Sequence, residues 1–132
     1  MATENGALAT GLPEEKPGII LVDLDATMAH YAGWDGGKIG RILPGVKETL
    51  ARLRAAGHKV LVWTTRGDHP DVRAWLVANA IDYDGFYPAV KPMDLALIID
   101  DRAFRAENAG LDAERVLASI KPAWRIQKEA RS

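Results

Sequence analysis

Three short apolar runs divide the chain and predict its strands. They span residues 19–22, 60–63 and 95–99, and none of them contains a charged side chain. Continuous apolar runs of this length are typical of strands that are buried on both faces of a parallel sheet. A stretch rich in glycine, residues 30–43, follows the first run, and its lack of periodicity predicts a loop.

Helical periodicity fills the segments between these runs. An apolar stripe with spacings of four and three runs from Val46 to Leu53, and Gly57 is placed to end that helix. Asp68, with Pro70 two positions later, predicts the start of a second helix before the third run.

Strands that alternate with helices predict an α/β fold, here a three-layer α/β/α sandwich around a parallel sheet. At 132 residues the chain has room for about one domain. We expect that domain over residues 18–132, with a helical tail from residue 111 that is kinked or begins again at Pro122. Residues 1–17 show no periodicity and are predicted to be a flexible leader.

The composition excludes several classes of protein. A hydrophobic share of 48% with 27% charged residues excludes a disordered or fibrous chain. Because there is no cysteine, disulfide scaffolds, thiolate nucleophiles and cysteine-based zinc sites are excluded as well. The net charge of −1 disfavours nucleic acid and acidic membrane surfaces as partners. The first apolar run is far shorter than the ~20 residues that a membrane span needs, so we expect a cytoplasmic protein.

Polar side chains follow each predicted strand at the point where the strand ends. They are Asp23 and Asp25 after the first, Thr64, Thr65 and Arg66 after the second, and Asp100 and Asp101 after the third, with Lys91 shortly before the third. Ligands of parallel α/β sheets bind outside the carboxyl ends of the strands, so we expect these side chains to converge. Four carboxylates in one place repel one another unless a hard cation lies among them, and oxygen ligands favour Mg²⁺. A lysine beside such a metal suits attack on a phosphate.

The order of these motifs resembles that of the haloacid dehalogenase superfamily of phosphohydrolases. The matching segments are ILVDLDAT, VLVWTT, KP and LALIIDD, and they cover the chain from residue 18 to about residue 104. One departure is Ala26, which stands where the first family motif usually has glycine in a tight backbone turn. The resemblance implies a Rossmann-like fold and hydrolysis of a phosphomonoester through an aspartyl-phosphate.

The resemblance also implies a role for each catalytic candidate. Asp23 matches the nucleophile that attacks phosphorus, and Asp25 matches the general acid that later acts as a base on water. Thr64 matches the hydroxyl that hydrogen-bonds the phosphoryl group, and Lys91 matches the lysine that screens charge there. Thr65 directly follows Thr64 and would take its place if the motif were shifted by one residue, but the end of the apolar run favours Thr64.

Mg²⁺ is the cofactor that the resemblance implies. Asp23 would supply a side-chain oxygen and Asp25 its backbone carbonyl, while Asp100 and Asp101 would complete the ligands. Asp100 is favoured as the closer of the last two, with Asp101 as a second or water-mediated ligand. Arg66 is predicted to bind substrate, and an ion pair with a carboxylate is the alternative for it.

The segments between the first motif and Thr64, and between Thr64 and Lys91, are too short for a cap domain. The chain therefore resembles the short capless bacterial and phage members of the superfamily. The leading hypothesis is a Mg²⁺-dependent phosphatase for a small phosphorylated substrate, and the alternatives are a phosphatase of nucleic-acid ends and a non-catalytic binding protein. An uncovered site also predicts a homo-oligomer or a large substrate, of which the homo-oligomer is favoured, with residues 30–42 as a local flap.

Overall fold

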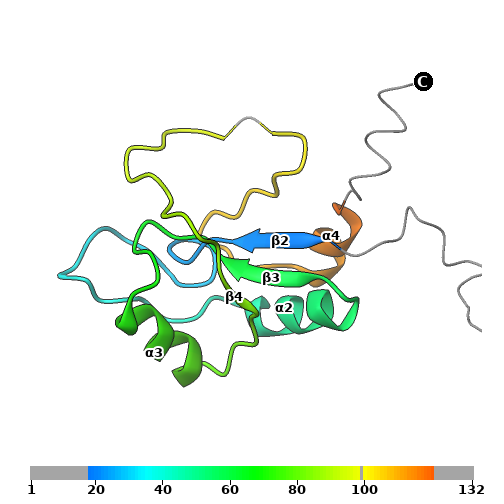
Figure 1. Ribbon diagram of the computed structural model, residues 1–132, viewed down its shortest axis with the longest axis horizontal. Coiled ribbons are helices and arrows are strands. Elements are labelled where there is room, and N and C mark those ends of the chain that lie inside the picture. The colour runs from blue at the N-terminus through cyan, green and yellow to red at the C-terminus, as the bar shows by residue number, and fades with distance from the viewer. Residues whose placement is uncertain (1–17, 99, 121–132) are drawn as a thin grey trace, which may run out of the picture.

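The computed structural model describes residues 18–98 and 100–120 and shows an α/β fold around a small parallel sheet (Figure 1). The strands of the described part are β2 (Ile19–Val22), β3 (Lys59–Val62) and β4 (Gly85–Phe86). They pair in the order β2–β3–β4, and both pairings are parallel. The helices of this part are α2 (Val46–Ala55), α3 (Pro70–Ala78) and α4 (Ala113–Ala118). The predicted α/β fold with a parallel sheet is confirmed.

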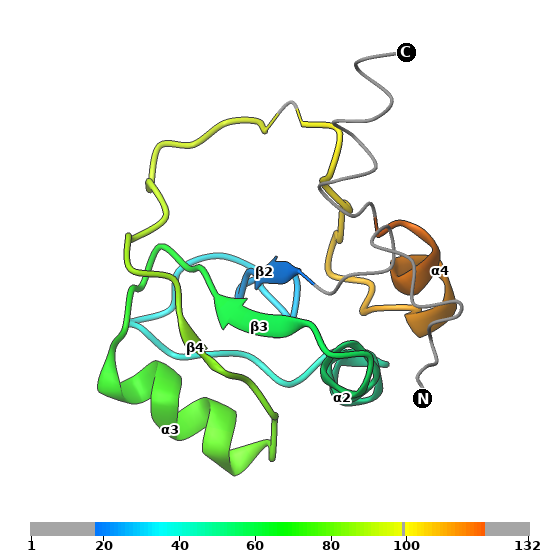
Figure 2. The same cartoon turned by 45° about the vertical axis from the view of Figure 1, so that its right-hand side comes forward.

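The sheet buries one of its faces more completely than the other. Val22, Val60 and Val62 are at most 6% exposed, whereas Ile19 and Leu21 are 63% and 42% exposed. Because side chains alternate along a strand, the three valines point to the face on which α2 and α3 lie (Figures 1 and 2). The prediction that the first strand is buried on both faces is therefore wrong, since an apolar run does not reveal which of its faces is covered.

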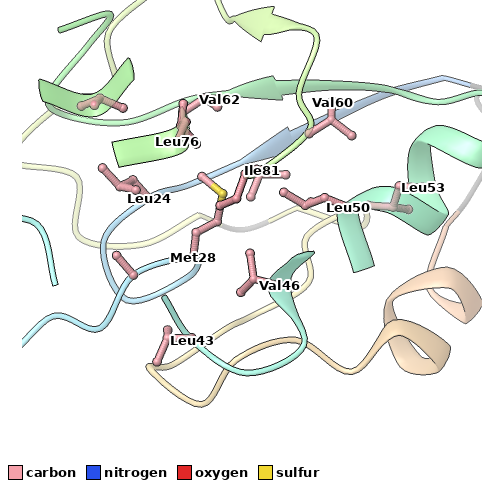
Figure 3. Close-up of a cluster of buried hydrophobic side chains, with 13 residues drawn as sticks. Leu24, Met28, Leu43, Val46, Leu50, Leu53, Val60, Val62, Leu76 and Ile81 are labelled. Carbon is pink, nitrogen blue, oxygen red and sulfur yellow. The ribbon is translucent and has the colours of Figure 1, made fainter. Parts of the chain in front are cut away.

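The core fills the space between this face of the sheet and the helices (Figure 3). Leu24 and Met28, in the turn that follows β2, are fully buried together with Leu50 of α2 and Leu76 of α3. Full burial of one such side chain stabilises a fold by about 1.5–3 kcal/mol. The turn after β2 is thus stabilised by the burial of Leu24 and Met28 in the core as well as by backbone hydrogen bonds such as that from Met28 to the carbonyl of Leu24.

The helix α3 begins within one residue of the predicted position. His69 is its N-cap, with Nδ1 accepting the N–H of Asp71 at 3.0 Å, and Pro70 occupies the first helical position. Asp68, the predicted cap, instead forms an ion pair with Arg73. The carboxylate of Asp68 is thus paired with an arginine of the helix and does not serve as its N-cap.

The other two described helices agree with their predictions. The helix α2 carries the predicted apolar stripe, and Gly57 follows its end with a φ of 96° that suits glycine. The helix α4 lies in the predicted helical tail, where the side chain of Asp112 accepts the N–H groups of Glu114 and Arg115.

The predicted third strand is not formed by residues 95–98. These residues lie in an irregular segment that arches away from the sheet, and Ile99 is outside the described residues (Figures 1 and 2). The exposed fractions of Leu95, Leu97 and Ile98 are 38%, 62% and 43%. The third strand of the sheet is β4 instead, in a stretch whose composition predicts turns.

Chain connectivity accounts for this difference. A parallel neighbour of β2 would require the chain to return to the start of the sheet, and such a crossover takes about a dozen residues or more. The N–H of Lys91 donates to the carbonyl of Thr64 at 3.2 Å, which holds the chain at the end of the sheet where the strands finish. Residues 92–94 are too few to make the return.

Two predicted features lie outside the described residues, namely the leader 1–17 and the kink at Pro122. None of the helices in residues 18–98 and 100–120 has the length and apolar character that a membrane crossing demands.

A buried hydroxyl on α2 yields a stability prediction. Thr49 is fully buried, and its Oγ1 has no hydrogen-bond partner in the part of the chain that the structure describes. Thr49→Val removes this hydroxyl and keeps the shape of the side chain, so we expect the free energy of unfolding to rise by about 1 kcal/mol. Urea unfolding measures the change.

Thr49→Ser is the matched control, because it keeps the hydroxyl and removes a buried methyl group. We expect it to lower the free energy of unfolding by about 1 kcal/mol. A valine variant that is less stable than the natural chain would contradict the prediction.

Candidate functional site

The carboxyl ends of β2 and β3 bring two polar turns together. Val22 stands opposite Val62 in the parallel ladder, and the N–H of Trp63 donates to the carbonyl of Val22 at 2.9 Å. Asp23 and Thr64 therefore leave the sheet at the same edge. The structure thus unites the polar residues that follow the first two predicted strands.

Lys91 joins Asp23 at this edge. Its Nζ lies 3.0 Å from Oδ2 of Asp23, whose Oδ1 accepts the N–H of Leu24 at 2.8 Å. The side chains of Lys91 and Asp23 are 18% and 27% exposed, so the pair is shielded yet reachable from solvent. The ring of Trp63, with its centre 5.4 Å from Nζ, further favours the cation. The ammonium group can bind an anionic group such as phosphate, and the neighbouring carboxylate oxygen can then act as a nucleophile toward it.

Asp25 is held by Arg66 through both of its carboxylate oxygens. Nε of Arg66 donates to Oδ2 at 2.8 Å and Nη2 donates to Oδ1 at 2.9 Å. The side chains of Arg66 and Asp25 are 9% and 18% exposed. The hydrogen bond to Asp25 raises the pKa of Arg66 above its ordinary value, against the opposing effect of burial. Arg66 therefore stays charged and fixes the plane of the Asp25 carboxylate.

Thr64 links the two ion pairs through its own peptide and side chain. It is 2% exposed, and its Oγ1 accepts the N–H of Arg66 at 3.2 Å. Its carbonyl accepts the N–H groups of Gly67 and Lys91 at 3.1 and 3.2 Å. A hydroxyl that accepts one hydrogen bond still has its proton to donate. Thr65, the alternative in this motif, is half-buried next to it.

Asp100 and Asp101 lie apart from this cluster. Both are exposed, in the segment that leaves the sheet after Lys91. Oδ1 of Asp100 accepts the N–H of Arg102 at 2.8 Å, which lowers the pKa of that carboxyl, and Asp101 pairs with the Arg102 guanidinium at 3.5 Å. The predicted meeting of four carboxylates is not found, because the strand that would carry the last two is absent from residues 95–98.

This arrangement does not fit the predicted Mg²⁺ site. Within residues 18–98 and 100–120, no group of three or more His, Asp or Glu side chains is placed to hold a metal ion. Mg²⁺ requires oxygen ligands in near-octahedral geometry, several of them from water, with one or two carboxylates from the protein. Here the side chain of Asp23, which was predicted to supply an oxygen, is already paired with Lys91, and Asp100 and Asp101 lie apart from it.

Asn108 is a residue of this region that the sequence patterns do not reveal. Its side chain accepts the N–H of Tyr31 at 2.8 Å and donates to the Tyr31 carbonyl at 2.6 Å. Its own N–H donates to the carbonyl of Ala26 at 2.8 Å. Asn108 thereby ties the base of segment 30–42 to the turn that carries Asp25. Since 77 positions separate Asn108 from Tyr31, no local motif marks the contact.

A cavity of about 250 Å³ adjoins the cluster at Thr64. Phe86, Tyr87 and Val90 contribute apolar walls, and Asp68 stands at its rim. A larger cavity of about 490 Å³ lies at the other end of β3, around Arg54, away from the candidate site. Thr64 lines the smaller cavity, whereas Asp23, Asp25 and Lys91 do not.

Comparison of the chain with family models, with curated proteins and with solved structures finds no match. The resemblance to the haloacid dehalogenase superfamily therefore remains a prediction from the motifs themselves.

The turn between Asp25 and Thr27 gives a second stability prediction. Ala26 has a φ of 66°, a left-handed conformation that disfavours any side chain. Ala26→Gly relieves this strain and keeps both backbone hydrogen bonds, so we expect the free energy of unfolding to rise by about 1 kcal/mol. Thermal or urea unfolding measures the effect.

Ala32→Gly serves as the control, since Ala32 is exposed and lies outside the left-handed region. Glycine there adds freedom to the unfolded chain and is expected to bring no gain. Equal effects of the two substitutions would show that the turn at Ala26 is not strained.

Proposed function

We propose that this protein hydrolyses phosphomonoesters, with Asp23 as the nucleophile that forms an aspartyl-phosphate. The observation that carries the proposal is the contact of 3.0 Å between Oδ2 of Asp23 and Nζ of Lys91 at the end of the sheet. The carbonyl of Thr64 accepts the N–H of Lys91, and Asp25 follows Asp23 two residues along the same turn. A nucleophile, a cation, a proton carrier and a hydroxyl donor are the groups that phosphoryl transfer needs.

In the first step, an oxygen of Asp23 attacks phosphorus and the bond from phosphorus to the ester oxygen breaks. A proton on Asp25 passes to the leaving oxygen, so the alcohol departs neutral. The Lys91 ammonium and the Thr64 hydroxyl donate hydrogen bonds to the phosphoryl oxygens, on which charge is concentrated.

In the second step, water attacks phosphorus of the aspartyl-phosphate. Asp25, now a carboxylate, takes a proton from this water, and the bond from phosphorus to the Asp23 oxygen breaks. Inorganic phosphate leaves, Asp23 is again a carboxylate, and Asp25 again carries its proton. Both steps use only groups that this chain supplies.

The finer fold is also part of the proposal. We propose a capless member of the haloacid dehalogenase superfamily, with a three-layer sandwich as its full architecture. The four motifs, in their order, support this. The net charge of −1 supports a small substrate rather than a nucleic-acid end.

The two steps above use no metal, so Mg²⁺ is tested separately. We expect the purified protein to release phosphate from p-nitrophenyl phosphate, and the measurement is repeated with EDTA and with added Mg²⁺. A panel of sugar phosphates and a 3′-phosphorylated oligonucleotide then separates small substrates from polymer ends. Turnover that EDTA abolishes and Mg²⁺ restores would show that a metal takes part in these steps, whereas no turnover on any ester would overturn the proposed function.

Asp23→Asn tests the nucleophile. An amide is a poor nucleophile, so we expect turnover to fall by a factor on the order of 10⁴. Asp82→Asn is the matched control, an exposed carboxylate before β4 that is expected to leave turnover unchanged. Trapping the aspartyl-phosphate at Asp23 by mass spectrometry gives a direct readout, and an Asp23→Asn variant with natural turnover would contradict the assignment.

A further inference from the structure

The guanidinium of Arg66 is almost entirely occupied by protein atoms. Besides its two bonds to Asp25, Nη1 donates to the carbonyl of Gly37 at 2.8 Å and Nη2 to that of Lys38 at 3.3 Å. The ring of Trp34 lies 5.0 Å from the guanidinium carbon. Four of the five N–H donors of the side chain are thus engaged within the chain.

We infer that Arg66 is a positioning residue, which aims the proton of Asp25 at the leaving oxygen and couples that carboxyl to segment 30–42. The inference rests on the proposed function. It differs from the predicted role of Arg66 in substrate binding, because a side chain that is 9% exposed and engaged in four bonds has little left to offer a phosphate.

The geometry leaves room for the proton that Asp25 must carry. Each carboxylate oxygen has two lone pairs, and each receives one hydrogen bond from Arg66. One lone pair on each oxygen remains, and a proton bound there lies in the plane that Arg66 fixes. During the first step this proton moves to the leaving oxygen, while Arg66, whose pKa is raised by Asp25, keeps all its own protons.

Arg66 also fixes the position of segment 30–42 relative to Asp25. The carbonyls of Gly37 and Lys38 belong to this segment, whose base is tied to the turn after β2 by Asn108. A shift of segment 30–42 would therefore also move the guanidinium that orients the carboxyl of Asp25.

A second pair of the same kind provides a control within the molecule. Arg54 donates to both oxygens of Asp84 at 3.2 and 2.9 Å, but this pair is exposed and lies at the other end of β3. Arg54→Lys disturbs a bidentate pair without touching the candidate site.

The test is the dependence of turnover on the leaving group. 2,4-Dinitrophenyl phosphate releases a stable anion and needs no proton, whereas phenyl phosphate does need one. In Arg66→Lys, which keeps the charge but not the fork, we expect kcat/KM for phenyl phosphate to fall about 10- to 100-fold. For dinitrophenyl phosphate we expect kcat/KM to change within about threefold, because kcat/KM reports the steps up to release of the leaving group and this leaving group needs no proton. Arg54→Lys should change neither.

Equal losses of kcat/KM on the two esters would overturn the inference in favour of substrate binding by Arg66, because both esters carry the same phosphate. The double variant Asp25→Asn/Arg66→Lys should show no loss on phenyl phosphate beyond that of Asp25→Asn, because the two residues act as one unit. Additive losses in the double variant would reject the inference. If Arg66→Lys fails to fold, Arg66→Gln replaces it, and guanidinium ion is expected to rescue the turnover of phenyl phosphate by Arg66→Ala. Failure of that rescue would also reject the inference. A natural chain inactive on both esters overturns the proposed function instead.

Discussion

The parallel pairing of β2 with β3 is the interaction on which the candidate site depends. With Val22 opposite Val62, the chain leaves both strands at the same height, and the two polar turns begin side by side. A slip of one residue would turn Val60 and Val62 away from the core, so burial enforces the register. The core thus determines where the catalytic candidates lie, although none of their side chains belongs to it.

Charge balance is the second constraint on this edge of the sheet. Two carboxylates that face the same turn would repel each other, and a bound cation is one remedy. The structure shows another, in which Lys91 is paired with Asp23 and Arg66 with Asp25. Both pairs are mostly shielded from solvent, where an unpaired charge would be costly. The predicted excess of negative charge is therefore met by the chain itself.

The parts of the fold that were predictable are those encoded by local pattern. Local pattern is enough to recognise the apolar runs at 19–22 and 60–63, which are continuous, and the stripe of α2, which has a helical period. The run at 95–99 has the same appearance, and yet its neighbours leave residues 95–98 no path to a parallel position. The partner of Arg66 and the role of Asn108 depend on contacts between distant segments, which no spacing along the chain expresses.

Those distant contacts also determine when the site can come into existence. The hydrogen bonds that build it join residues 41, 68 and 77 positions apart, and the loops that they close carry an entropic cost that grows with length. The site is therefore expected to assemble late in folding, after β2 and β3 have paired and α2 has covered them. During synthesis the start of segment 30–42 cannot be bound by Asn108 until that residue has left the ribosome, so the two polar turns of the candidate site stay incomplete for most of translation.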